Sequence, residues 1–241
     1  MKSIPRQFFT IFQKEFSSFL YPILSYIFIV VFLVILSWLF FQNFFIINQA
    51  TLRGFFSLVP WFFLFLVPAL AMRTWAEEKK TGTLETLLTL PYAEWHLIAA
   101  KFLAGVAFLA CVLILSLPLP ISIARLGNVD TGQIIGQYIA TLFLGSTMFA
   151  LGQWLSSLTK NAIVSFILSV AVCFVLIIIG VDFLNRSGGI LDEIRQSVSL
   201  LSHYESMARG VIDLRDVVYF LSLIFFFLFL NVQSLHQRHW K

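Results

Sequence analysis

Long apolar runs, separated by short polar stretches, dominate the pattern of hydrophobic and polar positions along the chain. Each run is comparable in length with the ~20 residues that a helix needs to cross the hydrocarbon core of a bilayer. The pattern therefore predicts six membrane-spanning helices, over residues 21–41, 55–72, 97–124, 134–155, 163–181 and 217–232. The first run carries no charge and no small-residue cleavage site follows it, so we expect a retained span rather than a signal peptide.

Small residues recur in the fourth run, where Gly136 and Ala140 stand four residues apart and Gly145 and Gly152 follow. Small side chains let neighbouring helix backbones approach closely within membranes. We expect this packing to occur within one subunit, with a contact between two subunits as the alternative.

An amphipathic pattern precedes the first run, over residues 3–19. Apolar side chains recur there at helical spacing, and polar and basic side chains take the opposite face. The residues that define the two faces most clearly are Arg6, Phe8, Phe12, Lys14 and Phe16. A basic amphipathic helix of this kind lies in the membrane interface, so we expect an interfacial helix on the cytoplasmic side.

A second segment that is neither a span nor a simple loop covers residues 185–215. Ser187, Gly188 and Gly189 interrupt the chain there, and short apolar and amphipathic stretches follow. We expect short helices that lie at the outer face of the membrane or dip into it. Charges of both signs indicate intrahelical ion pairs on a solvated face, with a role in an outer gate as the functional interpretation. These charged residues are Glu205, Arg209, Asp213 and Arg215.

The composition supports a membrane protein, since 59% of the 241 residues are hydrophobic and 12% are charged. Typical globular proteins have ~45–50% apolar and ~25% charged residues. A soluble domain as apolar as this one would expose large hydrophobic patches and would aggregate. We therefore expect an all-α polytopic membrane protein in which residues 1–241 form a single transmembrane domain. Because the spans take up about half the chain, no separate nucleotide-binding domain of ~150 residues fits in the remainder.

Lysine and arginine are distributed unevenly between the two sides of the predicted spans. Six spans place both termini on one side, together with the loops at 73–96 and 156–162. Of the 16 Lys and Arg residues, six fall on the opposite side: Arg53, Arg125, Arg186, Arg195, Arg209 and Arg215. The excess on the first side assigns both termini to the cytoplasm by the positive-inside rule.

The sequence lacks the motifs of several function classes. It has no P-loop, no nucleophile elbow and no zinc-protease helix, so we expect no enzyme activity, cofactor or metal site in this chain. No basic stripe lies on a soluble surface, which makes nucleic acid a poor partner. The spans carry almost no ionisable groups at mid-depth, which argues against an ion-coupled secondary transporter and suggests an energy source on another subunit. A secondary transporter, and a membrane anchor for a cytoplasmic complex, stay open as alternatives.

The most unusual stretch lies between the second and third runs, at residues 73–91. Compact charges follow the end of the second run, Gly82 and Thr83 can end one helix and cap the next, and Pro91 ends the pattern. The charged positions are Glu77, Glu78, Lys79, Lys80 and Glu85, and the apolar stripe is Leu84, Leu87 and Leu88. Two interpretations follow from the residues alone: a surface helix that lies on lipid, or a docking element for a cytoplasmic partner.

The stretch RTWAEEKKTGTLETLLTLP resembles the signature of ABC-2 type transporter permeases, the membrane subunits of ATP-binding-cassette (ABC) transporters. The matching positions are Arg73, Glu77, Glu78, Lys79, Gly82, Thr83, Leu84, Glu85, Leu87, Leu88 and Pro91. Residues 151–167 and 203–222 add further similarity. Together the three stretches resemble the gliding-motility (GldF-like) and copper-processing (NosY-like) branch of the family.

The resemblance implies a permease with six spans in the bacterial inner membrane, most often an exporter. Such a permease pairs with a second one, identical or related, on two cytoplasmic ABC ATPase subunits that bind ATP and Mg. An accessory or periplasmic protein is a further expected partner. The helix over 3–19 resembles the elbow helix of the family, residues 73–91 its coupling helix, and the helices of 185–215 those that close the path on the outer side.

The same resemblance assigns roles to single residues. Glu77, Glu78, Lys79 and Lys80 are expected to dock to the ATPase by charge pairing. The stripe of Leu84, Leu87 and Leu88 is expected to pack in the ATPase groove or to brace the elbow helix. Glu85 is expected to hold the helix to neighbouring backbone or basic groups.

Overall fold

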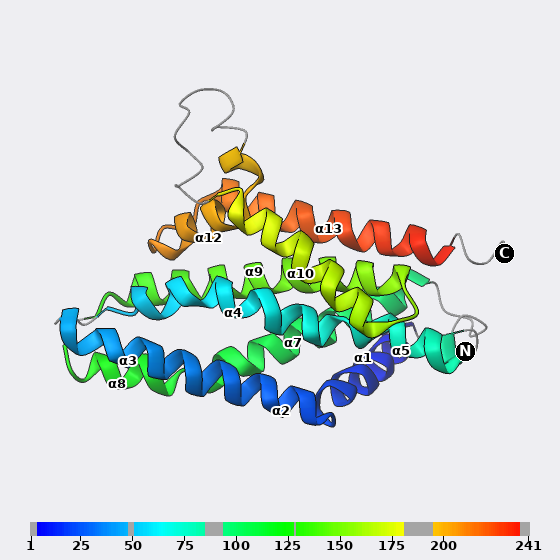
Figure 1. Ribbon diagram of the computed structural model, residues 1–241, viewed down its shortest axis with the longest axis horizontal. Coiled ribbons are helices and arrows are strands. Elements are labelled where there is room, and N and C mark those ends of the chain that lie inside the picture. Colours follow the sequence, from blue (N-terminus) through cyan, green and yellow to red (C-terminus); the bar gives the residue numbers. More distant parts are fainter. Residues whose placement is uncertain (1–3, 48–50, 85–93, 128, 181–194, 237–241) are drawn as a thin grey trace.

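The computed structural model describes residues 4–47, 51–84, 94–127, 129–180 and 195–236. The regular structure in these ranges is helical, and the helices form an elongated bundle (Figure 1). In chain order the elements are α1 (Ile4–Leu20), α2 (Ile23–Val30), the π-helix η1 (Val31–Ile35), α3 (Leu36–Ile47), α4 (Arg53–Ala71), α5 (Arg73–Thr81), α7 (Glu94–Leu115), α8 (Pro118–Ala124), α9 (Thr131–Leu158), α10 (Ala162–Ile178), α12 (Leu200–Ala208) and α13 (Leu214–His236).

Five of the described helical stretches are long and apolar enough to cross a membrane: Ser25–Gln42, Arg53–Thr81, Glu94–Ala124, Thr131–Leu158 and Leu214–His236. The remaining predicted span, over 163–181, corresponds to α10, an apolar helix of 17 residues. That length lies at the lower limit for a spanning helix. The prediction of an all-α polytopic membrane protein is confirmed.

Successive long helices run in opposite directions along the bundle (Figure 1). The start of α1, the whole of α5 and the end of α13 therefore lie at one end, which we call the α5 end. The tips of α3 and α8 lie at the opposite end. The third predicted span, over 97–124, is not one uninterrupted helix: α7 stops at Leu115 and α8 begins at Pro118, which has no N–H to continue the helical hydrogen bonds.

Helix α9 is the centre of the bundle, because it packs against α4, α5, α7, α10, α12 and α13. Its glycines permit these close contacts. A Cβ atom at Gly152 would lie 2.6 Å from the Cβ atom of Ala71 on α4, and one at Gly136 would lie 3.0 Å from the Cα atom of Gly210, just after α12. The expected close packing within one subunit is therefore confirmed.

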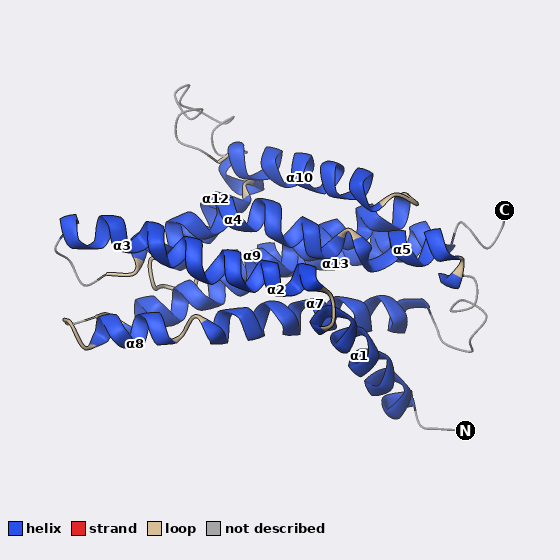
Figure 2. Cartoon of the chain, turned by 60° about the horizontal axis from the view of Figure 1, so that its bottom comes forward, coloured by secondary structure: helices blue, strands red, loops and turns tan. Residues whose placement is uncertain are grey.

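The amphipathic helix expected over residues 3–19 is α1, which leaves the bundle axis at an angle (Figure 2). One face of α1 packs along α7. Phe12 and Phe16 stack with ring centroids 6.0 Å apart, while Lys14 is exposed and Phe9 is 57% exposed on the outward side. Phe8 is half-buried, and Arg6 lies in the first turns of α1, where side chains are outside the described part.

The close contact of α4 with α9 predicts that Gly152→Ala destabilises the protein by about 1–3 kcal/mol, since neither backbone can yield freely. Thermal unfolding in detergent would measure this loss. Gly54→Ala is the matched control, because a Cβ atom there would lie 3.8 Å from Phe40 Cδ2, an ordinary contact. Alanine is the better helix former, so this control should be neutral or stabilising by less than about 1 kcal/mol. Equal Tm values for the two variants would contradict the close contact.

Candidate functional site

Helix α5 continues the direction of the chain beyond α4, with a turn at Met72 between the two helices. The main chain at this turn is held by side chains. The carbonyl of Ala71 accepts a hydrogen bond from Thr74 Oγ1 at 2.7 Å, and the carbonyl of Met72 accepts one from Ser156 Oγ at 2.8 Å. The turn therefore has satisfied carbonyl groups although it interrupts the helix.

The hydroxyl of Ser156, near the end of α9, caps the start of α5. Ser156 Oγ accepts hydrogen bonds from the backbone N–H groups of Trp75 and Ala76, both at 3.1 Å. Such N–H groups in the first turn have no partner within their own helix. A cap usually comes from the residue just before the helix, whereas here it comes from a residue about 80 positions away. The cap attaches α5 directly to the central helix.

Lys79 makes a second attachment between α5 and the end of α9. Its Nζ atom donates to the carbonyl of Ser157, one residue before the end of α9. A cation at the carboxyl end of a helix also interacts favourably with the helix dipole. Ser157 Oγ in turn donates to Ser234 Oγ on α13 at 2.9 Å. These hydrogen bonds tie α5 to both α9 and α13.

Trp75 fills the space between α5 and the helices behind it. Its side chain is fully buried in an apolar cluster with Leu84, Leu97, Ile98 and Leu235. Ile11 of α1 packs against the same cluster. Leu84 therefore faces its own chain, which agrees with the bracing alternative for that residue rather than with a groove on a partner.

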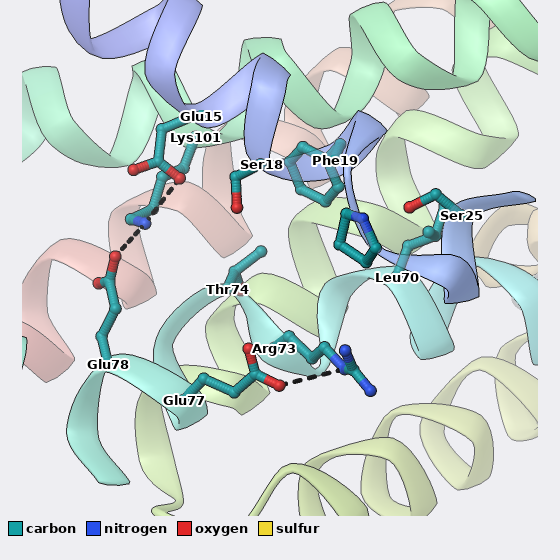
Figure 3. Close-up of a pocket in the computed structure, with 11 residues that line it drawn as sticks. Glu15, Ser18, Phe19, Ser25, Leu70, Arg73, Thr74, Glu77, Glu78 and Lys101 are labelled. Atoms are coloured by element: carbon teal, nitrogen blue, oxygen red, sulfur yellow. Dashed lines mark hydrogen bonds and ion pairs between the residues drawn. The ribbon is translucent and has the colours of Figure 1, made fainter. Parts of the chain in front are cut away.

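A buried ion cluster joins α5 to α1 and α7 (Figure 3). Lys101 of α7 is 2% exposed, and its Nζ atom lies 2.9 Å from Glu15 Oε2 on α1 and 2.6 Å from Glu78 Oε1 on α5. The same Nζ atom lies 5.0 Å from the centroid of the Trp75 ring. A lysine keeps its charge at such depth only when it is paired, and here it has two carboxylates and an aromatic face. We call Glu15, Glu78 and Lys101 the ion triad.

The ion triad was only partly visible in the sequence. Glu78 had been expected to face a partner, but 17% of its side chain is exposed and it pairs within the chain. Lys101 and Glu15 were not predicted as a pair. A signal did exist, because Glu15 stands four residues from both Ile11 and Phe19, on the apolar stripe of α1. A lone carboxylate on that stripe implies a buried cation as its partner.

A cavity of about 120 Å³ lies beside the ion triad, between α1 and the junction of α4 with α5 (Figure 3). Its lining mixes apolar, hydroxyl and charged side chains from the α1–α2 connection, from α4 and from α5. Arg73 and Glu77 form an ion pair at its edge, with 3.2 Å between Nε and Oε1. Both side chains are about half exposed, so this pair contributes little to stability.

Some of the remaining predicted coupling residues are exposed on α5, and the others lie outside the residues that the structure describes. Glu77 is exposed in the middle of α5, and Lys80, Gly82 and Thr83 are exposed at its tip. Gly82 ends α5 with a φ of 74°, the left-handed conformation expected for a glycine that terminates a helix. Glu85, Leu87 and Leu88 lie outside the described residues, as does Pro91.

Comparison with protein families tests the resemblance directly. The model of the ABC-2 family transporter protein matches residues 9–209, which reach from α1 to the end of α12. The chain belongs to the ABC-2 transporter family. A comparison with curated proteins finds no match.

Membership in the ABC-2 family makes this chain a multi-pass membrane subunit of an ABC transporter, which works with an ABC ATPase in a lipid bilayer. Members of the family normally carry no catalytic centre of their own. The matched region contains the ion triad and the capped start of α5 described above.

At the opposite end of this ABC-2 protein, the predicted outer-gate residues line one polar cavity of about 320 Å³. Glu205, Arg209, Asp213 and Arg215 share this cavity with His203 and Asp216, among others. Asp213 Oδ1 accepts from the backbone N–H of Arg215 at 3.1 Å. The expected solvated helix face is thus the wall of a cavity between α12 and the start of α13.

A buried pair holds α12 to α13 beside this cavity. His203 Nδ1 lies 2.7 Å from Asp216 Oδ1, and His203 Nε2 lies 3.2 Å from the carbonyl oxygen of Ser197. The carboxylate of Asp216 and the carbonyl of Ser197 thus lie at opposite nitrogens of the ring and fix its orientation. On the other side of α12, the Tyr204 hydroxyl donates to the carbonyl of Phe56 at 2.7 Å, and burial raises the pKa of Tyr204 so that this donor stays protonated.

The cap of α5 predicts that Ser156→Ala loosens this helix at its start. Two backbone N–H groups and one carbonyl lose their partner in a buried place, so the expected cost is about 1–3 kcal/mol. Amide hydrogen exchange at Trp75 and Ala76 would report it as faster exchange. Ser122→Ala is the control, because that hydroxyl is exposed on α8 and bonds only within its own helix. Unchanged protection of both amides in Ser156→Ala would contradict the cap.

Proposed function

We propose that this chain is the permease subunit of an ABC exporter and that α5, with the segment after it, docks to the cytoplasmic ATPase. The observation that carries the proposal is the two-sided character of α5. One side is bound to α9 and to the ion triad, while the exposed side presents Glu77, Lys80, Thr81, Gly82 and Thr83 to solvent. We call these five residues the docking surface.

The docking surface combines charge with exposure. Glu77 has 52% of its side chain exposed, compared with 17% for Glu78, and Lys80 is also exposed. Exposed charges of both signs at a protein interface mainly set orientation and register. Glu85, Leu87 and Leu88 follow in the chain and belong to the same proposed element.

The orientation of the proposed permease follows from charge. Both termini and the docking surface lie on the side that holds ten of the 16 Lys and Arg residues, which the positive-inside rule places in the cytoplasm. The similarity to ABC-2 permeases supports the bacterial inner membrane as the location, and in this orientation the cavity lined by Arg209 and Arg215 lies on the outer side. Glu205, Arg209, Asp213 and Arg215 are in place to form the outer end of the translocation path.

The proposed complex contains two permeases, identical or related, and two ATPase subunits that bind ATP and Mg. An accessory or periplasmic protein completes it. The similarity of residues 73–91, 151–167 and 203–222 to the gliding-motility and copper-processing branch supports placing the protein there and supports export as the direction. ATP-driven closure of the two ATPase subunits would push on α5 and move the spans between inward-open and outward-open states.

Reversing the two charges of the docking surface, Glu77→Lys with Lys80→Glu, is expected to weaken binding of the ABC ATPase that copurifies with the wild-type permease. A tenfold rise in Kd, about 1.4 kcal/mol, is the expected scale for exposed interface charges. Gly82→Pro should weaken binding further, because proline cannot adopt the φ of 74° at that position. Titration of the ATPase onto permease in nanodiscs would measure both effects.

Arg125→Glu is the control for this titration, because Arg125 is exposed at the opposite end of the bundle. Its Kd should equal that of the wild type. Equal binding by all variants would refute the docking surface. Transport by the permease alone in an ion gradient would instead favour a secondary transporter, and normal function with an inactive ATPase would favour a membrane anchor.

A further inference from the structure

We propose that Lys101 is the positioning residue that makes the elbow helix α1 move together with α5, and the coupling part of this inference rests on the proposed function. The single ammonium group of Lys101 binds one carboxylate from each of the two helices. Lys101 thereby links α1 to α5 through two ion pairs.

The geometry places Lys101 as the bridge between helices that otherwise have separate neighbours. The backbone of α1 packs along α7, whereas the backbone of α5 packs against α9, α4 and α10. The Nζ atom of Lys101 reaches Glu15 on α1 at 2.9 Å and Glu78 on α5 at 2.6 Å. The link between α1 and α5 through α7 is therefore ionic, and it adds to the apolar contact that Ile11 makes with the cluster around Trp75.

The charges of the ion triad decide whether an ionic link joins the two helices. Two carboxylates and one ammonium leave one net negative charge in a poorly solvated place, where charge interactions are strong. With Lys101 present, each carboxylate is held within hydrogen-bond distance of the cation. Without it, the two carboxylates would repel each other or take up a proton, and either outcome removes the ionic link between α1 and α5.

The cavity beside the ion triad leaves the two helices without close packing at the level of the triad. Glu15, Glu78 and Lys101 all line it, and so do Ser18 of α1 and Thr74 of α5. Because the space between the two helices is partly open there, close-packed side chains do not fix their separation at this level. The bridge through Lys101 supplies a restraint at this level, in addition to the apolar cluster around Trp75, and Ser156 restrains the other side of α5.

A distance measurement in the full-length permease tests the bridge without any ATPase. Spin labels at Phe9→Cys on α1 and Thr81→Cys on α5 use exposed positions, in a background where Cys111 and Cys173 are replaced by serine and alanine. Pulsed electron paramagnetic resonance in nanodiscs should give a narrow distribution of the distance between the two labels, both in the protein that keeps Lys101 and in the Lys101→Arg variant. Lys101→Met should give a broader distribution, because it removes both ion pairs that link the two helices.

A neutral triple variant keeps the test decisive if Lys101→Met fails to fold. Glu15→Gln, Glu78→Gln and Lys101→Met together remove every charge of the ion triad and leave no buried ion unpaired. This variant should fold and give a broad distribution centred near the wild-type distance. A distribution as narrow as that of the wild type would overturn the proposal, since packing would then fix the two helices.

The coupling role has its own readout, the stimulation ratio, which is the rate of ATP hydrolysis per ATPase bound to permease divided by the rate of the same ATPase without permease. The neutral triple variant should lower this ratio by at least ~5-fold, whereas Lys101→Arg should keep it at the wild-type value. A loss of folded permease alone would reduce the amount of bound ATPase and leave the ratio per bound ATPase unchanged. Glu94→Gln, which removes a charge of α7 at the same end outside the ion triad, serves as the control.

The two hypotheses fail in different ways. If no ABC ATPase binds the wild-type permease, the proposed function is refuted, but the distances between α1 and α5 still decide whether Lys101 holds these helices. If the ATPase binds and the stimulation ratio is unchanged in the neutral triple variant, the docking proposal stands and the role of Lys101 in coupling is refuted.

Discussion

The absence of hydrogen-bonding partners in a bilayer is the constraint on which the rest of this structure depends. A polar group that the bundle buries is costly unless it finds a partner within the chain, and in the described part a few side-chain atoms, Trp75 Nε1 and Glu78 Oε2 among them, have no hydrogen-bond partner. This requirement is met most densely where α5 leaves the bundle, through the shared hydroxyl of Ser156 and the shared ammonium of Lys101. Ser156 Oγ and Lys101 Nζ therefore also attach the proposed docking element to the bundle.

The two attachments of α5 differ in kind, and this difference organises the functional end of the molecule. The Ser156 cap is neutral, short-ranged and directional, and it joins α5 to the most buried helix of the bundle. The ion triad acts over a partly open space and reaches a helix at the periphery. A displacement of α5 would thus be passed to the centre through a hydrogen-bonded contact and to the elbow helix through a charged one.

The sequence predicted the elements of the fold well, because long apolar runs leave few alternatives to spanning helices. Helices α4, α9 and α13 begin and end within a few residues of the predicted spans. The glycine at the end of α5 was predictable from its backbone freedom. The partners of Lys101 and Ser156 were not predictable, because they depend on which helices pack together. Ser156 stands 80 positions from Ala76, and Lys101 stands 86 positions from Glu15. Glu78 could be recognised as important from its motif, but its inward direction could not.

The position of Ser156 has an electrostatic consequence. The amino end of α5 meets the carboxyl end of α9, so the positive end of one helix dipole faces the negative end of another. This contact is buried, and dissolved ions screen it little, whereas the charges of Glu77 and Lys80 lie in reach of the solvent. Ionic strength therefore acts on the outward-facing half of α5 and leaves its attachment to the bundle almost untouched.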